Sequence, residues 1–597
     1  MLNTPTFVFT TPGDSRAEFT RYAFGAPMAQ WTVTRQAELP AAFARVAEHQ
    51  AAGYFVAMAL AYEAAPGFDR ALSCHLPGVL PLAWFAVFRE PVEFRATTER
   101  FTLGQPRVAS AKDDYVSTLQ KVLAHIRAGD IYQANVTIRA HCEFSGSAYG
   151  AFCALNEAVP VPYAAYVDTG AVQIVSLSPE LFLERRGNTL RSKPMKGTAS
   201  RKPSWDEDEA ARLALYRSEK DRAENTMIVD LMRNDLGRIC RSGSVRTENE
   251  YYVERFPTVH QMTTTVTGEL ERDGSLFEIF RATFPAGSIT GAPKVRASQI
   301  IRDIEATPRG IYCGSIGLFF PGGDFVASVA IRTLEIQGNV ATLGIGSGIV
   351  ADSEPEREWD EALLKATFAT MRPQAFGLYE AFRYVPDSGF RNLDLHLTRL
   401  EHSCMCFSRP FPRDEILRKL DALRVTLGDA PTRVRLDLNG YEISLSLIPE
   451  ELGWNERGVT VMIPDFRLDP QDARLYHKTT NRPEKLALRA LAKSLGADES
   501  LFLNTRGEFA EGTLSSFVFK VGGEWITPHL SCGLLPGVWR DHQVSEGRAR
   551  EGIVRFDQLA SIEEIRIGNS VRGEERVVRI ILENGTEVYS ERRVHLC

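Results

Sequence analysis

The sequence contains the stretch Ser192-Lys193-Pro194-Met195-Lys196-Gly197-Thr198-Ala199-Ser200-Arg201, in which Lys196 stands among small and turn-forming residues. A lysine amine is a nucleophile only when it is unprotonated, which requires burial or nearby positive charge to lower its pKa. Lys193 and Arg201 could supply such charge. Taken alone, a basic segment of this kind is more often a solvated loop, so the other motifs must decide between the two interpretations.

The composition is that of an ordinary soluble globular protein. Of 597 residues, 44% are hydrophobic and 24% charged, which allows two or more cores. Lys and Arg total 69 against 76 Asp and Glu, a net charge of -7 that predicts no nucleic-acid or anionic-membrane partner. The N-terminus lacks a basic segment followed by an apolar run, and the densest apolar stretch, residues 54–62, is too short to span a bilayer. We therefore expect a cytoplasmic protein with reduced cysteines.

Two acidic pairs share one spacing. Asp221 and Glu224 lie in a segment with helical periodicity, and Glu358 and Glu361 repeat the interval further on. Residues three apart lie on one face of a helix. A single pair of this kind is usually solvated. Four carboxylates that faced one another would repel unless a cation lay among them, and Mg²⁺ takes oxygen ligands of this type.

Other motifs lie around these pairs. Glu180 follows Ser-Pro at the start of a strand-like run, where a lone glutamate is usually a surface residue. His260 precedes a Thr-rich strand and could equally be a hydrogen-bonded core histidine. Residues 284–296 are more specific, because their glycines let backbone approach a ligand and Pro293 can start a helix whose amides favour an anion. This segment lacks the Gly-Lys-Ser/Thr ending of a nucleotide P-loop, so ATP is not implied.

Together these motifs resemble the chorismate-using enzymes, and within them the aminodeoxychorismate synthases, which carry a lysine in a Pro-Ile-Lys-Gly-Thr motif; here the isoleucine position is Met195. The resemblance implies an α+β fold of large antiparallel sheets flanked by helices. It implies that Lys196 is a covalent nucleophile and Glu180 the general acid for a departing hydroxyl. It also implies that Mg²⁺ joins the chorismate carboxylate to the two acidic pairs, Asp221, Glu224, Glu358 and Glu361. The implied substrate-binding residues are Gln133, His260, Ser288, Thr290, Tyr312, Arg332, Gly346, Ser347 and Gly348.

The remainder of the chain, from residue 376, resembles the fold-type IV pyridoxal phosphate enzymes, the group of branched-chain aminotransferases and aminodeoxychorismate lyases. Lys478 would attach the cofactor, and Glu511 would pair with its ring nitrogen. The implied phosphate and cofactor contacts are Arg399, Thr513, Ser515 and the amides near Val538 and Trp539. The Lys-x-x-Asn-Arg run at residues 478–482 resembles the lyases more than the aminotransferases.

The two resemblances predict a domain boundary after Pro373. We expect a chorismate-binding domain at residues 1–373, with an N-terminal scaffold part at 1–110 and a catalytic core at 111–373, and a pyridoxal phosphate lyase domain at 374–597. The expected function is conversion of chorismate and ammonia to 4-amino-4-deoxychorismate, and then to 4-aminobenzoate for folate biosynthesis. No cysteine lies in a Gly-x-Cys-x-Gly-His-Gln context, so ammonia would come from a separate glutamine amidotransferase subunit. The second resemblance also allows a homodimer through the cofactor domain.

Several alternatives stay open at this point. Anthranilate synthases have alanine in place of Lys196, and isochorismate synthases have a lysine in place of Gln133, so both are disfavoured. The second domain could be a true aminotransferase or a docking module without activity.

Overall fold

The computed structural model describes residues 4–13, 19–271, 274–373, 376–440, 442–448, 453–454 and 457–591. The chain divides into two compact units, residues 1–200 with 212–374 and residues 201–211 with 375–597. Helix α5 (Trp205–Arg217) begins in the short segment that belongs to the second unit. The predicted domain boundary at residue 374 lies outside the described residues.

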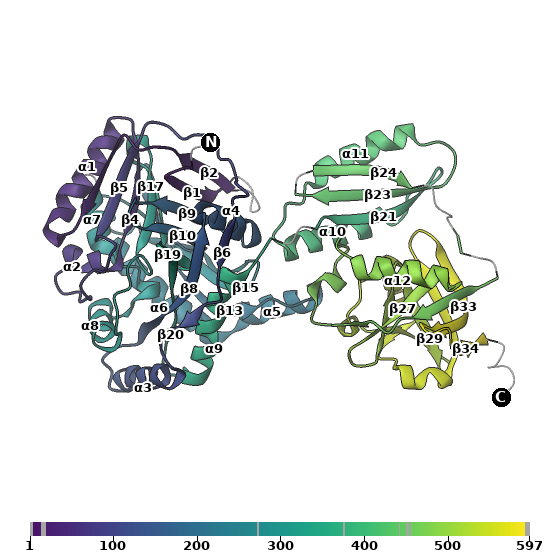
Figure 1. The fold of residues 1–597 in the computed structure, drawn as a ribbon. Helices are drawn as coiled ribbons and strands as arrows, with labels where there is room; N and C mark the ends of the chain where they lie inside the picture. The colour runs from purple at the N-terminus through teal and green to yellow at the C-terminus, as the bar shows by residue number, and fades with distance from the viewer. Residues whose placement is uncertain are drawn as a thin grey trace. The chain divides into compact units, whose positions relative to one another are not determined.

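Two antiparallel sheets form the first unit (Figure 1). The first sheet runs in the order β16 (Gly291–Ala292), β8 (Gln133–Gly146), β20 (Val340–Ile349), β19 (Thr333–Gln337), β10 (Gln173–Ser178), β9 (Tyr163–Asp168), β1 (Phe7–Pro12) and β2 (Phe19–Phe24), with β6 (Phe101–Leu103) and β7 (Arg107–Val108) also paired to β8. The second runs β13 (Met195–Ser200), β15 (Val259–Glu269), β12 (Thr189–Lys193), β11 (Leu181–Arg186), β18 (Phe325–Val329), β17 (Ser315–Phe319), β4 (Phe55–Leu60), β5 (Ala83–Phe88) and β3 (Ala29–Val33), with β14 (Arg246–Arg255) beside β15. Residues 1–110 thus contribute strands to both sheets.

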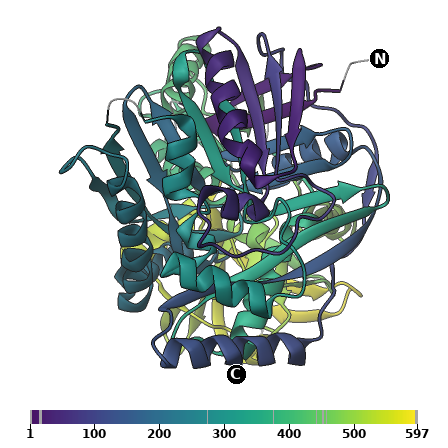
Figure 2. The same ribbon diagram turned by 90° about the vertical axis from the view of Figure 1, so that its left-hand side faces the viewer.

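The two sheets face each other across a shared core, and helices cover their outer faces. Strand β4 shows the alternation that produces this arrangement, because Ala57 and Ala59 pack between the sheets while Val56 and Met58 face the helices. Helix α1 runs beside β4 and β5 in both views (Figure 2). The helices of this unit are α1 (Leu39–Ala51), α2 (Ala65–Phe68), α3 (Lys112–Arg127), α4 (Ala148–Ala158), α6 (Glu219–Gly237), α7 (Leu276–Thr283), α8 (Lys294–Ile304) and α9 (Pro355–Ala366).

The second unit has two sheets of different kinds. An antiparallel sheet contains β22 (Gly389–Phe390), β21 (Leu378–Val385), β23 (Thr432–Asn439) and β24 (Glu442–Ile448), and packs against α10 (Leu393–Cys406) and α11 (Arg413–Thr426). A mixed sheet contains β26 (Arg467–Leu468), β27 (Glu499–Asn504), β25 (Val459–Ile463), β33 (Gly573–Leu582), β32 (Ile562–Asn569), β29 (Ser516–Val521), β30 (Glu524–Pro528) and β31 (Arg550–Gly552), with β28 (Phe509–Gly512), β34 (Glu587–Ser590), α12 (Pro483–Ser494) and α13 (Val538–Ser545) beside it.

Two expectations from the sequence concern where an element begins. The helix that Pro293 was expected to start is α8, whose N-cap is Pro293. The histidine expected before the Thr-rich strand lies within β15 itself.

Candidate active sites

Lys196 lies on a bulge in strand β13, where the pairing with β15 shifts register between Met195 and Thr198. Such bulges re-aim a side chain, and here the next residue, Gly197, has a φ of +88°. A Cβ on Gly197 would lie 2.9 Å from Asp221 Cβ, so only glycine fits between this strand and α6. The lysine is therefore a partly buried strand residue, and the solvated-loop interpretation is wrong.

The positive charge near Lys196 comes from a residue that the sequence did not indicate. Burial lowers the pKa of Lys196, and the Lys365 ammonium lowers it further, against nearby carboxylates that raise it. Lys193 pairs instead with Glu254 at 2.6 Å, and Arg201 belongs to the second unit, where it pairs with Asp208. The expected contribution of Lys193 and Arg201 is therefore wrong, because both charges are already paired.

Glu180 lies at the turn between β10 and β11 and is only 4% exposed. Burial raises the pKa of Glu180 to about 7, against a hydrogen bond from Ser288 and the charge of Lys196, which both lower it. Ser288 Oγ donates to Glu180 Oε1 at 2.6 Å. Glu180 and Lys196 line one cavity of about 360 Å³, so an acid that is protonated near neutral pH lies beside an amine with a lowered pKa.

Gln133 is fully buried at the start of β8, and neither side-chain polar atom has a hydrogen-bond partner among the described residues. A buried amide without partners is costly and points to a group that the site receives. Gly348 lies on β20, the strand paired with β8, close to Gln133. A Cβ added at Gly348 would collide with Lys196 Nζ and lie 3.1 Å from Gln133 Nε2. Gly348 thus leaves the space that the lysine amine occupies.

The four predicted metal ligands also line this cavity, two from α6 and two from α9. The pKa of Glu224 is raised by burial, and the charges of Asp221 and Glu358 raise it further, against Lys196 and Lys220. Glu361 pairs with Lys365 at 2.7 Å. Among the described residues no group of three or more candidate ligands is close enough to hold a metal ion. The donor chemistry nevertheless fits Mg²⁺, which binds through one or two carboxylates and keeps water and substrate oxygens.

Arg332 lines the same cavity and makes no ion pair among the described residues. Burial lowers the pKa of Arg332 to about 10, and its backbone has a φ of +50°. An arginine without an acidic partner in a cavity is suited to a ligand carboxylate. Tyr312 and Gly346 also line the cavity, and Lys365 donates to the Gly346 carbonyl at 2.9 Å.

Four predicted substrate-binding residues, Gln133, His260, Thr290 and Ser347, do not line the cavity. The last three are buried, and Thr290 Oγ1 donates to the Ala286 carbonyl at 3.0 Å. Their positions indicate packing and backbone support around the site. The charged residues of the cavity lining that the sequence did not single out are Lys365 and Lys220. Lys365 follows Glu361 by four residues and Lys220 directly precedes Asp221, and both positions offered only a weak signal.

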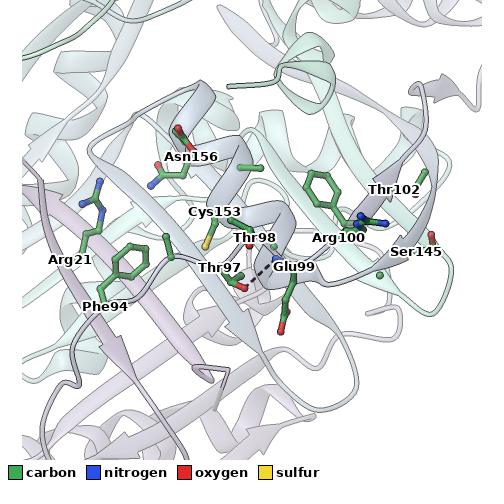
Figure 3. A pocket seen from close by; sticks show the side chains of 16 residues that line it. Arg21, Phe94, Thr97, Thr98, Glu99, Arg100, Thr102, Ser145, Cys153 and Asn156 are labelled. Carbon is green, nitrogen blue, oxygen red and sulfur yellow. Dashed lines mark hydrogen bonds between the residues drawn. The ribbon is translucent and has the colours of Figure 1, made fainter. Parts of the chain in front are cut away.

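A separate cavity of about 840 Å³ lies in the first unit between residues 94–102 and α4 (Figure 3). Its lining includes Arg21, Phe94, Cys153 and Asn156. It contains none of the predicted site residues, so its size does not bear on the chemistry of Lys196.

In the second unit, a cavity holds all of the residues predicted to contact the cofactor. Lys478 Nζ lies 4.9 Å from the centre of the Tyr379 ring. Burial lowers the pKa of Lys478, and the charges of Arg482 and Arg399 lower it further, against Tyr379 and Glu380. Conversely, Lys478, Arg482 and Arg435 together outweigh burial and lower the pKa of Tyr379 to about 8. Tyr379 was missed by the sequence reasoning.

Arg399 is held by a buried carboxylate that the sequence did not indicate. Its Nε and Nη2 donate to Glu380 at 2.9 and 2.7 Å, and its Nη1 donates to the Pro536 carbonyl. His396 Nδ1 lies 2.7 Å from the same carboxylate. The arginine therefore stands fixed beside the N-terminus of α13, whose cap is Gly537. This combination of guanidinium and helix amides fits a phosphate group.

Glu511, Thr513 and Ser515, which were also predicted to contact the cofactor, form hydrogen bonds with other groups of the protein. Glu511 Oε1 accepts from Lys485 Nζ at 2.5 Å, and its Oε2 accepts from the Leu535 amide at 3.1 Å. The hydroxyls of Thr513 and Ser515 donate to Glu499, whose pKa is raised by burial. Thr513 and Ser515 line the cavity, but these hydroxyl contacts hold the loop in shape. The lysine, the acid and the phosphate donors together fit pyridoxal phosphate.

Comparison with known families agrees with this geometry. Residues 100–371 match the model of the chorismate binding enzymes, and residues 377–580 match the model of the class IV amino-transferases. The chain thus carries two enzyme regions, one after the other, and each region matches the model of one of these families. This confirms the predicted resemblances and the α+β fold class.

The relatives of the first region are more specific. It is 40% identical over 271 residues to aminodeoxychorismate synthase component 1 of Bacillus subtilis, covering 45% of this chain and 57% of that protein. It is 41% identical over 254 residues to an anthranilate synthase component 1 of Haloarcula marismortui, covering 42% and 52%. The chain thus spans little more than half the length of these relatives. Nearly equal identities to both do not choose between the two reactions.

A crystal structure described as a 2,3-dihydroxybenzoate-specific isochorismate synthase from Bacillus anthracis has a similar fold, with a TM-score of 0.50 and 21% identity, covering 61% of this chain and 95% of that one. At this identity the likeness concerns the fold only. Among the described helices, none has the length and apolar character needed to cross a membrane.

Proposed function

We propose that the chain carries out two consecutive reactions, the amination of chorismate to 4-amino-4-deoxychorismate in the first unit and the release of pyruvate in the second, which leaves 4-aminobenzoate. The observation that carries the first reaction is the pair formed by Lys196 and Glu180 in one cavity. The pKa of the amine is lowered, and that of the carboxyl is raised to about 7. Opposite shifts of this kind are typical of a nucleophile and a general acid.

In the first reaction the Lys196 amine adds to C2 of chorismate. As the two conjugated ring double bonds shift toward C4, Glu180 gives its proton to the C4 hydroxyl, which leaves as water. Ammonia then forms a bond to C4 and loses a proton, both double bonds shift back, and the bond between C2 and Lys196 breaks as the departing lysine amine takes up a proton. Arg332, which has no acidic partner among the described residues, would hold a substrate carboxylate.

Metal and ammonia complete the proposal for this unit. Mg²⁺, when bound by the carboxylates of α6 and α9, would neutralise the ring carboxylate of the substrate. Ammonia would come from a glutamine amidotransferase subunit. The relative in Bacillus subtilis is named as a component 1, and the chain carries no sequence motif of a glutaminase nucleophile.

In the second reaction the proposed residues bind and orient pyridoxal phosphate and move one proton. Arg399 and the α13 amides would hold the phosphate, and Glu511 would face the ring nitrogen. The cofactor, when bound, supplies the electron sink. Lys478, with its lowered pKa, takes the proton from C4 of the substrate, and pyruvate leaves as the ring becomes aromatic.

Product analysis tests both halves. The purified chain, supplied with pyridoxal phosphate and Mg²⁺, is incubated with chorismate and ammonia, and the products are separated by chromatography with mass detection. We expect equal amounts of 4-aminobenzoate and pyruvate. Anthranilate or isochorismate as the product would overturn the first half. Accumulation of aminodeoxychorismate without 4-aminobenzoate would overturn the second half.

A further inference from the structure

Lys485 is a buried lysine of the second unit to which the proposed reaction assigns no role. It lies on α12, seven residues after Lys478, and is 7% exposed. Its Nζ lies 2.5 Å from Glu511 Oε1 and 5.6 Å from the centre of the Phe502 ring. Among the described residues, Glu511 is the only hydrogen-bond partner of this amine. A buried ammonium needs such a partner, so the two charges stabilise each other.

Only one residue of the Lys485–Glu511 pair lines the cofactor cavity. Glu511 lines it, whereas Lys485 does not. With the Leu535 amide on its second oxygen, the Glu511 carboxylate has one protein donor on each oxygen, and each oxygen keeps one lone-pair direction for a ligand group. Lys485 therefore reaches the cavity through Glu511.

We propose that Lys485 is a positioning residue that fixes the Glu511 carboxylate and, by offsetting part of its charge, sets how strongly this site protonates a bound pyridoxal phosphate. The proposal rests on the proposed function of the second unit. A lone buried carboxylate would favour the protonated cofactor more strongly than a carboxylate already paired with an ammonium. The lysine thus makes the acid a weaker partner for the ring nitrogen than its burial alone would.

Other groups contribute to the field in the cavity and must be held constant in a test. The charged or titratable residues that line it beside Glu511 are Tyr379, Arg399, Arg433, Lys478, Arg482 and Arg572. All of these residues stay unsubstituted in the test, although the Lys485 charge also acts on Arg482 and Tyr379.

The test is a pH titration of the absorbance of pyridoxal phosphate bound to the full chain. Lys485→Met and Lys485→Gln both remove the charge, so either one serves if the other fails to fold. We expect the pH midpoint of the absorbance change to rise by roughly one unit, because the Glu511 charge, no longer offset by Lys485, favours the protonated form of the cofactor. Lys493→Met, on the exposed part of the same helix, is the matched control and should leave the midpoint unchanged.

The same substitution in a Glu511→Gln background shows whether Lys485 acts through Glu511. We expect the shift to disappear there, since the amine without its partner becomes neutral by burial. An unchanged midpoint in both single variants, or an equal shift in the Glu511→Gln background, would overturn the proposal. Failure of the unsubstituted chain to bind the cofactor would instead overturn the proposed function of the second unit, and this inference with it.

Discussion

Ser288 Oγ donates a 2.6 Å hydrogen bond to Glu180 Oε1, although the two residues are 108 positions apart in the chain. The bond favours the ionised carboxylate, while burial favours the protonated one and prevails. The balance between the two effects therefore sets the pH range in which Glu180 can act as an acid.

This balance predicts the pH dependence of the synthase reaction. A general acid must be protonated, so kcat/KM for chorismate should be high below the Glu180 pKa of about 7 and fall as pH rises through it. In Ser288→Ala the ionised form loses its hydrogen bond, so the pKa rises further and the falling limb moves to higher pH. Ser315→Ala, which removes a buried hydroxyl that donates to the Ser328 carbonyl, is the control. A limb that stays in place in Ser288→Ala would contradict the assignment of Glu180.

Lys196→Ala tests the covalent mechanism. Loss of a positioned nucleophile should reduce formation of aminodeoxychorismate on the order of 10²-fold or more, while the second unit still converts supplied aminodeoxychorismate. Peptide mass analysis after denaturing trapping should locate a substrate adduct on Lys196 in the unsubstituted chain. Full synthase activity in Lys196→Ala would exclude the covalent mechanism and remove the preference over anthranilate synthase.

Gly348→Ala tests the space that the lysine amine needs. The added Cβ would collide with Lys196 Nζ, so the amine must move, and a displaced catalytic group can cost on the order of 10²-fold in rate. We expect the synthase rate to fall without loss of the fold, which circular dichroism can check. Gly237→Ala is the matched control, because its added Cβ meets nothing within 4 Å. An undiminished rate in Gly348→Ala would show that the amine works from another position.

The source of nitrogen is the next prediction. The purified chain should form aminodeoxychorismate from chorismate with ammonium salts, and should not do so with glutamine until a glutaminase subunit is added. The rate with ammonium should rise with pH in parallel with the free ammonia concentration, up to the pH at which Glu180 ionises. Turnover with glutamine by the chain alone would contradict this.

The spacing of residues in the sequence was enough to predict that the two carboxylates of each acidic pair share one helix face. Asp221 and Glu224 share a helix face because the helical period is a property of consecutive residues, and both line the cavity of the first unit. The same holds for Glu358 and Glu361 on α9. The sequence likewise determined the fold class and the order of the two enzyme regions, because all motifs of the first family precede those of the second along the chain.

Only the tertiary structure decided which partners surround these side chains and therefore how their pKa values are shifted. Lys365, not the neighbouring Lys193, provides the positive charge near Lys196, because Lys193 pairs with Glu254 while Lys365 reaches the site from α9. Ser288 likewise contacts Glu180 although it lies far away in the sequence. In the second unit, Glu380 fixes Arg399 through contacts between β21 and α10. Burial and long-range partners set these pKa values, and no pattern of neighbouring residues encodes either one.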